Sequence, residues 1–321
     1  MIRRGLAALV VTLGMVAAAC GGNGGGNGDV GGEGSSSPDG ELIVQTANYD
    51  LAVGEQSRFL AGILTPDQLF VSHGSVDIEF FYLGTREGEG TAEEGPTATA
   101  EFLPIEGPPN QPGPVAAPGS QGRGVYSADV TFDRAGFWAA QVTANLEEAP
   151  MSGRAIFEVY EEHRYPAVGQ RAPRTDNLTA DSEDAPPEAV DSRARDGEPL
   201  PDPELHQMTI AESIRRGEPA LVVFATPVYC VSRFCGPITD MIGELQSEYG
   251  DRANFIHVEV WRNFQNTVVN KGAADWIYRN DDLLEPWVYL IDANGVIAAR
   301  WDNVATRAEI EPLLEKLPKN G

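Results

Sequence analysis

Basic residues are scarce in this chain. Its 321 residues include 23 lysines and arginines against 48 aspartates and glutamates, which gives a formal net charge of −25 at pH 7. A surface of this sign repels the phosphates of nucleic acid and anionic lipid headgroups. The composition therefore argues against nucleic acid as a partner and favours a solvated acidic surface. The length is sufficient for two domains of ordinary size.

Long apolar runs are also missing, except for one at the N-terminus. Arg3 and Arg4 precede an apolar run over residues 5–19, which is too short to span a bilayer comfortably and is typical of an export signal. The run ends in Val-Ala-Ala-Ala-Cys20. This ending resembles the lipobox of bacterial lipoproteins, although that family prefers Leu where Ala17 stands. The resemblance implies that Cys20 is lipidated and anchors an extracytoplasmic protein to a bacterial membrane.

Cysteine is scarce as well, with three in the whole chain. If Cys20 carries lipid, as the resemblance implies, Cys230 and Cys235 remain as the only intramolecular pair. Two nearby thiols in an oxidising compartment tend to form a disulfide. The alternative is ordinary cleavage that leaves Cys20 as a spare thiol. Residues 1–20 are thus expected to be signal peptide and lipobox, and residues 21–40, ten of them glycine, a flexible tether.

Residues 41–162 show the alternation of half-buried β-strands. The clearest cases are residues 76–82 and 125–132, in which apolar and polar side chains alternate. The segment 124–145 resembles the closing hairpin of immunoglobulin-like domains on bacterial extracytoplasmic proteins. With regular turn signals, the pattern predicts an all-β immunoglobulin-like sandwich. Its strands are expected at residues 42–47, 58–64, 76–83, 97–103, 124–132, 136–145 and 153–159.

Residues 163–205 are expected to be a connector. Between Asp181 and Glu204 the chain holds nine acidic residues and five prolines. Such a composition buries too little apolar surface to become ordered by itself. The sequence therefore predicts an acidic, proline-rich linker between two domains.

From residue 206 onward the pattern changes to alternating strands and helices. An apolar strand is expected over residues 220–225, followed by Cys230, Cys235 and a helix that opens at Gly236-Pro237. Thiols at a helix N-terminus experience the positive end of the helix dipole, which favours the thiolate and makes a cysteine reactive. This is the one stretch whose residues suggest chemistry.

The order of elements in residues 206–321 resembles the thioredoxin-like family. Three stretches carry the resemblance: residues 222–226 with the cysteine loop, the helix after Gly236-Pro237, and residues 285–292. It implies an α/β thioredoxin-like domain after the β-sandwich. It also implies that Pro286 is a cis-proline that packs against the disulfide and aligns an extended substrate chain.

Two departures from that family bear on activity. Four residues separate the cysteines instead of the usual two, and Val223 stands where many members place a buried acid that moves protons. The register of the motif also stays open. Helix register favours Cys230 as nucleophile and Cys235 as resolving cysteine, whereas the Cys-Gly-Pro match would make Cys235 the first cysteine, with Ile238 in the place of the second.

Three functions follow from these residues. The first is thiol–disulfide exchange on exported proteins through Cys230, Cys235 and Pro286, without a cofactor. The second is a non-catalytic surface interaction module with a structural disulfide. The third, copper delivery, needs a histidine before the final hairpin, and none lies between Trp261 and Pro286. No metal site is expected: His257 falls in a strand and is expected to be a packing residue, while His163 and His206 flank the connector.

Overall fold

The computed structural model describes residues 41–319, except residues 88–90, 107–108, 120–122, 148, 231 and 233. The expected signal peptide, Cys20 and the glycine-rich tether lie outside the described residues. Within the described residues, no helix is long and apolar enough to cross a membrane.

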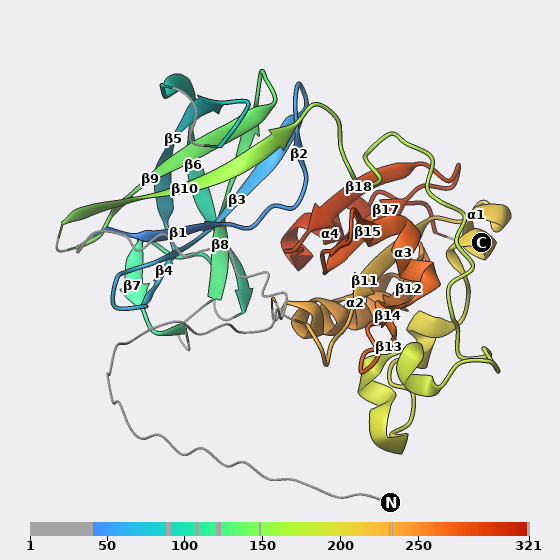
Figure 1. Cartoon of the computed structure of the whole chain (residues 1–321). Coiled ribbons are helices and arrows are strands. Elements are labelled where there is room, and N and C mark those ends of the chain that lie inside the picture. Colours follow the sequence, from blue (N-terminus) through green and yellow to red (C-terminus); the bar gives the residue numbers. More distant parts are fainter. Residues whose placement is uncertain are drawn as a thin grey trace, which may run out of the picture. The chain divides into compact units, whose positions relative to one another are not determined.

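The first ten strands pair into a single sheet, blue to green in Figure 1. Its strand order is β2-β10-β9-β5-β6-β8-β3-β4-β7, and β1 pairs with β3. In β5, Val76, Ile78 and Phe80 are buried while Asp77 and Glu79 between them are exposed, as alternation predicts. The strands are Ile43–Thr46 (β1), Leu51–Ala52 (β2), Gln56–Leu64 (β3), Phe70–Ser72 (β4), Ser75–Gly84 (β5), Glu93–Glu106 (β6), Val115–Ala117 (β7), Arg123–Thr131 (β8), Gly136–Asn145 (β9) and Pro150–Tyr160 (β10).

Leu42 ties β1 to β10 through a parallel bridge to Gly153. A Cβ atom at Gly153 would lie 2.1 Å from the carbonyl oxygen of Leu42, so this close approach of two backbones requires glycine. Buried aromatic side chains fill the core enclosed by the sheet. They meet mostly in tilted or edge-to-face pairs, which suit the ring quadrupole, and include Phe59, Phe80, Phe132, Trp138 and Phe157.

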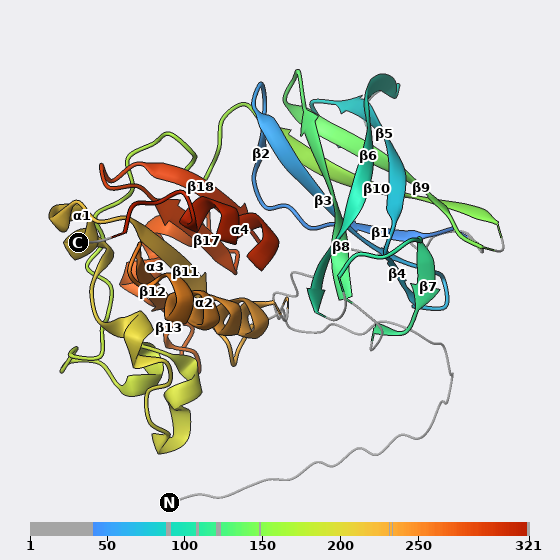
Figure 2. The same cartoon turned by 180° about the vertical axis from the view of Figure 1, so that it is seen from behind.

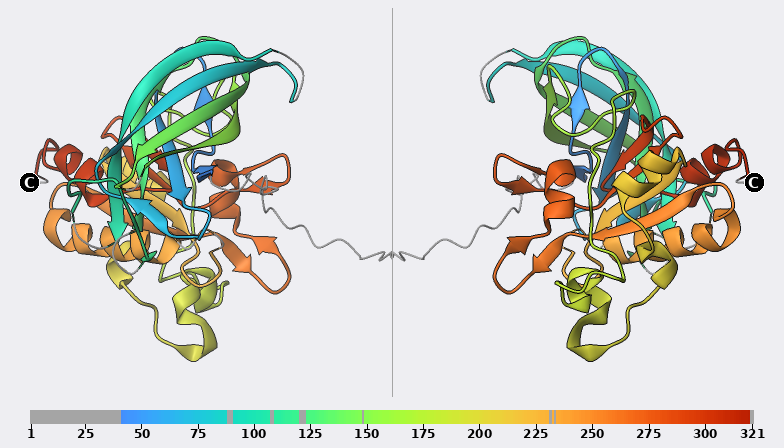
Figure 3. Two further views of the ribbon diagram at one scale, coloured as in Figure 1. Left: turned by 90° about the vertical axis from the view of Figure 1, so that its left-hand side faces the viewer. Right: turned by 90° about the vertical axis from the view of Figure 1, so that its right-hand side faces the viewer.

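A second sheet has the order β12-β11-β17-β18 and is seen from behind in Figure 2. β11 (Ala220–Ala225) runs parallel to β12 (Asn254–Glu259) and antiparallel to β17 (Trp287–Ile291), which forms a hairpin with β18 (Ile297–Asp302). Two short two-stranded ribbons lie between β12 and β17 in the chain and are visible in Figure 3. They pair β13 (Trp261–Asn263) with β14 (Val268–Val269), and β15 (Tyr278–Arg279) with β16 (Asp282–Leu283).

Helices cover both faces of this second sheet, and every residue of its strand β11 is therefore buried. Leu221 and Val223 join the apolar cluster of α2 (Cys235–Tyr249) and α4 (Arg307–Leu314). Val222 and Phe224 join the cluster of α1 (Ile210–Arg216) and α3 (Lys271–Ile277). The predicted strand over residues 220–225 and the predicted helix after it are thus confirmed as local elements.

Residues 163–205 are not the unstructured connector that their composition suggests. The segment contains short 3-10 helices at Pro187–Ala189 (η2), Ser192–Gly197 (η3) and, at its end, Pro203–His206 (η4). Ala189, Asp191 and Ser192 are all 0% exposed. The prediction from composition failed because the segment packs against another part of the chain. Ser192 and Asp191 are bonded to groups on β12, and the local sequence cannot show these partners.

The predicted fold class is also wrong. The expectation was an all-β immunoglobulin-like sandwich followed by an α/β thioredoxin-like domain, but strand (41%) outweighs helix (19%) and the sheets are large and mixed. Three of the four α-helices span only seven or eight residues. In the first half, β8 pairs with both β6 and β3, so the strands continue one sheet rather than dividing into two. Periodicity reports which side of a segment is buried, but not how strand edges pair.

Candidate functional site

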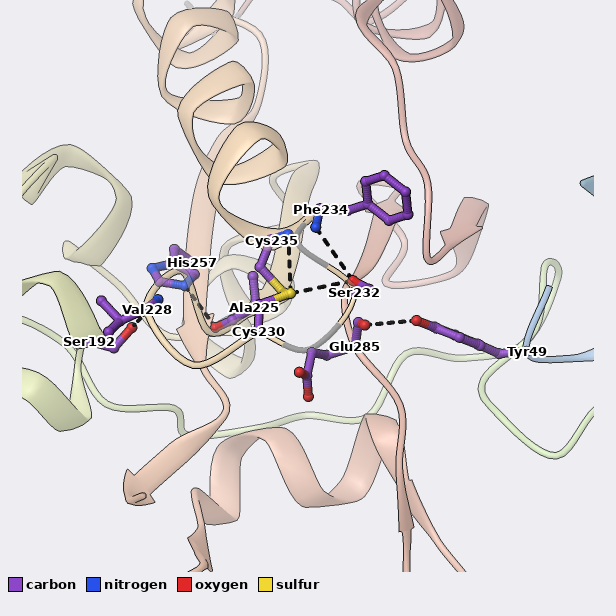
Figure 4. Close-up of a disulfide and its surroundings, with 10 residues drawn as sticks. All are labelled: Tyr49, Ser192, Ala225, Val228, Cys230, Ser232, Phe234, Cys235, His257 and Glu285. Carbon is purple, nitrogen blue, oxygen red and sulfur yellow. Dashed lines mark hydrogen bonds between the residues drawn. A yellow bond between two sulfur atoms is a disulfide. The ribbon is translucent and has the colours of Figure 1, made fainter. Parts of the chain in front are cut away.

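A disulfide joins Cys230 and Cys235 in the loop between β11 and α2, with Cα atoms 6.0 Å apart (Figure 4). The buried strand β11 ends just before Thr226 and Pro227, and Cys235 is the first residue of α2. The expected pairing is therefore present. The four-residue spacing places one sulfur at the N-terminus of a helix and the other in the loop before it.

The two cysteines differ in burial. Cys235 is 0% exposed and belongs to the apolar cluster beneath the loop, together with Val223 and Ile238. Cys230 is partly buried and packs against the margin of that cluster. An approaching thiol can therefore reach Cys230 Sγ more readily than Cys235 Sγ.

Polar groups surround Cys230 Sγ. The backbone N–H of Cys235 points to this sulfur at 3.4 Å, and the Ser232 hydroxyl lies 3.3 Å from it (Figure 4). The N–H of Phe234 donates to Ser232 Oγ at 3.4 Å. The Cys235 N–H and the positive end of the α2 dipole favour negative charge on Cys230 Sγ when the disulfide opens. Arg233, which lies between the two cysteines in the sequence, is outside the described residues.

Pro286 follows a cis peptide bond at the start of β17. Its carbonyl accepts the N–H of Asn303 at 2.9 Å. The preceding residue, Glu285, brings a carboxylate oxygen within 4.8 Å of both sulfurs. Sequence reasoning selected Pro286 and missed Glu285, although the two are adjacent. The role of Pro286 toward a substrate stays a prediction.

Residues of the first sheet region also reach this loop. The Tyr49 hydroxyl donates to the Glu285 carbonyl at 2.7 Å, and burial, reinforced by the charges of Glu285 and Asp302, raises the pKa of Tyr49 well above its ordinary value. Phe234 packs against Leu60, Val125 and Val304, of which the first two belong to β3 and β8. The first sheet, which was predicted to be a separate domain, thus covers one side of the cysteine loop.

Tyr229, next to Cys230 in the sequence, belongs to an aromatic pair beside the loop. Tyr229 stacks on Phe264 with ring centroids 4.0 Å apart and planes within 4°. Phe264 is 39% exposed, which is high for a large apolar side chain. The pair offers an apolar surface beside the disulfide.

Buried ionisable groups lie below the start of the loop. The ring of His257 contacts the Ala225 carbonyl through Nε2 at 3.1 Å, and the Val228 N–H donates to Ser192 Oγ at 3.2 Å (Figure 4). Glu259, opposite Ala225 in the strand register, accepts the Ser192 N–H at 2.8 Å. Burial raises the pKa of Glu259. A buried carboxyl is therefore present on β12, although position 223 holds valine.

The group around the sulfurs does not favour copper. The donor that joins Cys230 and Cys235 in space is the Glu285 carboxylate, a hard oxygen ligand, whereas Cu(I) prefers soft sulfur and imidazole donors. The two sulfurs are also bonded to each other. In this state they are not available as thiolate ligands.

Comparison with known proteins adds no assignment. No protein-family model matches the chain, and no curated protein and no solved structure matches it. The case for a function therefore depends on the residues of the site.

Proposed function

We propose that this protein carries out thiol–disulfide exchange with exported proteins through Cys230 and Cys235, as an oxidoreductase without a cofactor. The observation that supports the proposal is the unequal burial of the two sulfurs: Cys230 is partly exposed and Cys235 is fully buried at the first turn of α2. The sulfur of Cys230 is thus placed to react with a macromolecular partner, and the sulfur of Cys235 to act as the leaving group or to resolve the mixed disulfide.

The exchange begins with attack on the exposed sulfur. A substrate thiolate attacks Cys230 Sγ, the Cys230–Cys235 bond breaks, and the sulfur of Cys235 leaves as a thiolate stabilised at the N-terminus of α2. A second substrate thiolate then attacks the substrate sulfur of the mixed disulfide and releases Cys230. The substrate dithiol loses two electrons and two protons, and the protein gains both. In the reverse direction Cys230 attacks a substrate disulfide and Cys235 resolves the intermediate.

The test uses the full chain in a Cys20→Ser background, so that no third thiol reacts. Reduced protein is mixed with insulin or glutathione disulfide, and the exchange rate is measured. We expect turnover in this background, loss of turnover in Cys230→Ser, and a stable mixed disulfide in Cys235→Ser because the resolving thiol is missing. Equal, near-background rates with and without Cys230 would refute the proposal.

The second candidate is a surface interaction module in which the disulfide is purely structural. The contact of Phe234 with Leu60 and Val125 favours it, since this packing shields one side of the loop. A Cys230–Cys235 reduction potential below about −300 mV, the range of inert structural disulfides, would support this candidate over exchange.

The location is proposed from the lipobox resemblance. Cys20 would carry lipid and anchor the chain to a bacterial membrane, with residues 41–319 on the extracytoplasmic side. Replacing Cys20 with Ser should move the protein from the membrane fraction to the soluble fraction. Retention in the membrane fraction would contradict the anchor without affecting the exchange proposal.

A further inference from the structure

A second group of potential ligands lies apart from the disulfide. Asp191 caps the 3-10 helix η3, His206 ends η4, and His257 lies in β12. All three side chains are 0% exposed. One oxygen of Asp191 and one nitrogen from each ring lie within 4.8 Å of one another. The sequence did not predict that these three side chains lie together, because residues 163–205 were expected to be a linker and His257 a packing residue in a strand.

The distances in this group are long for hydrogen bonds and suited to a shared metal ion. Asp191 Oδ2 lies 3.3 Å from His257 Nδ1 and 3.5 Å from His206 Nε2. Ligands bound to zinc at about 2.0–2.2 Å in a tetrahedral arrangement are separated by about 3.4 Å. The spacing between these donors therefore leaves room for an ion among them.

The ring of His257 is oriented as that of a metal ligand would be. Because a carbonyl oxygen only accepts, the contact of His257 Nε2 with Ala225 O places the proton on Nε2 and, in the neutral ring, leaves the lone pair of Nδ1 directed at Asp191. His257 Nδ1 and both ring nitrogens of His206 are buried without a hydrogen-bond partner among the described residues. A backbone carbonyl that orients the far nitrogen of a histidine is the usual outer contact of a metal ligand.

The surrounding charges favour a cation. Arg193 holds Asp191 through two of its nitrogens, at 3.1 Å to Oδ1 and 2.7 Å to Oδ2, and is the one arginine or lysine among the described residues that is bonded to the group. Asp202 and Asp240 also pair with Arg193, and Glu259 lies two residues from His257 on β12. Three carboxylates thus pair with one guanidinium, so a divalent ion would offset an excess of negative charge.

We propose that Asp191, His206 and His257 bind a divalent transition-metal ion, with zinc the best match to two imidazoles and one carboxylate. Imidazole nitrogen argues against Ca²⁺ and Mg²⁺, which prefer oxygen ligands. Since the donors come from η3, η4 and β12, the ion would fasten the acidic segment to the second sheet. All three donors are 0% exposed, so a substrate could not reach the ion, and its role would be structural. The site is separate from the disulfide, and its test is independent of thiol exchange.

The competing interpretation is that a proton, not a metal, holds the group together. His257 could be an imidazolium that donates from both nitrogens, to Asp191 and to the Ala225 carbonyl. That state satisfies His257 but still leaves both nitrogens of His206 without a hydrogen-bond partner among the described residues. A metal ion would take one unpartnered nitrogen from each ring at once.

The experiment uses the full, oxidised chain with free thiol blocked by N-ethylmaleimide, so that sulfur cannot bind metal. Chelator-treated protein is titrated with Zn²⁺, and separately with Co²⁺, whose visible bands report tetrahedral coordination by nitrogen and oxygen. We expect one equivalent of either metal and a rise in the thermal midpoint with Zn²⁺. His206→Gln and Asp191→Asn should weaken binding by at least about 100-fold, more than the loss of an outer contact does. His163→Gln is the matched control and should bind like the parent.

The outcomes separate the two interpretations. Folded protein that takes up no stoichiometric Zn²⁺ or Co²⁺, or uptake that persists in His206→Gln, would overturn the metal site. A Co²⁺ spectrum without tetrahedral bands would overturn the proposed coordination. If the variants do not fold, the titration of the parent protein alone decides. Recovery of the circular dichroism signal when Zn²⁺ is added to unfolded, chelator-treated parent protein supports the site, and no recovery refutes it.

Discussion

The disulfide and the Asp191–His206–His257 group adjoin the same strand pair, β11 and β12, but differ in exposure and origin. The disulfide joins residues five apart in the sequence, and its Cys230 is partly exposed. The other group joins residues from three segments and is fully buried. Partial exposure suits exchange with a large partner, whereas complete burial suits a group that holds the structure. The difference suggests that the disulfide provides reactivity and that the buried Asp191–His206–His257 group provides stability.

The sharpest test of this contrast is Asp191→Ala. Removing the carboxylate leaves Arg193 and two buried histidines without their shared partner, and we expect the free energy of unfolding to fall by about 3–5 kcal/mol. Urea denaturation at pH 7 measures it. Glu183→Ala, at an exposed side chain of the same acidic segment, is the control and should change stability by less than about 0.5 kcal/mol. Similar small effects in both would remove the structural role of the buried group.

Leu60→Ala tests whether the first sheet shields the disulfide. Leu60 is 0% exposed and packs in the cluster that includes Phe234, so truncation should cost about 2–5 kcal/mol and speed reduction of the disulfide by dithiothreitol. Ile78→Ala creates a comparable cavity in the core of the first sheet, away from the cysteine loop. It should destabilise the fold without faster reduction under native conditions. Equal acceleration in both variants would show that global unfolding, not local shielding, controls access.

A second carboxylate–histidine group, Asp50 with His163, provides an internal comparison. Burial alone would raise the pKa of Asp50, but the hydrogen bond with His163 and the charge of Arg300 outweigh it and lower the pKa. Here Arg300 contacts His163 Nδ1 at 2.7 Å, so the ring is partnered and no metal is needed. Asp50→Asn should cost about 1.5–3 kcal/mol at pH 7.

The pH dependence of this variant has a defined sign. Because the folded-state pKa of Asp50 is lowered, its stabilising contribution is fully present above the unfolded carboxyl pKa of about 3.9 and is lost as the pH falls further toward the folded value. The stability difference between parent and Asp50→Asn should therefore be constant from about pH 5 to pH 7 and shrink below about pH 4. A difference that grows on acidification would contradict the lowered pKa.

Reduction of the disulfide should have the smallest effect on stability. A loop closed by residues five apart restricts the unfolded chain little, which corresponds to about 2 kcal/mol. Urea denaturation with and without dithiothreitol measures this value, and a variant with Cys230→Ser and Cys235→Ser should not respond to the reductant. A loss as large as that of Asp191→Ala would make the disulfide a structural element and favour the non-catalytic function.

Local features were largely predictable from the sequence. The strand at residues 220–225, the helix after the cysteines and the disulfide partners all depend on neighbours within a few positions, and the structure contains each of them. Short-range spacing fixes hydrogen bonding and burial along one element, so these features need no knowledge of the rest of the chain.

Only the tertiary structure decided the features that join distant segments. Composition could not show that residues 163–205 become ordered, because Asp191 and Ser192 obtain their partners from β12. Nor could it show that ten strands continue one sheet, or that Glu285 reaches the sulfurs from the start of β17. Strand-edge pairing and the partners of buried charges are set by which surfaces meet in space, and that depends on the whole fold rather than on local periodicity.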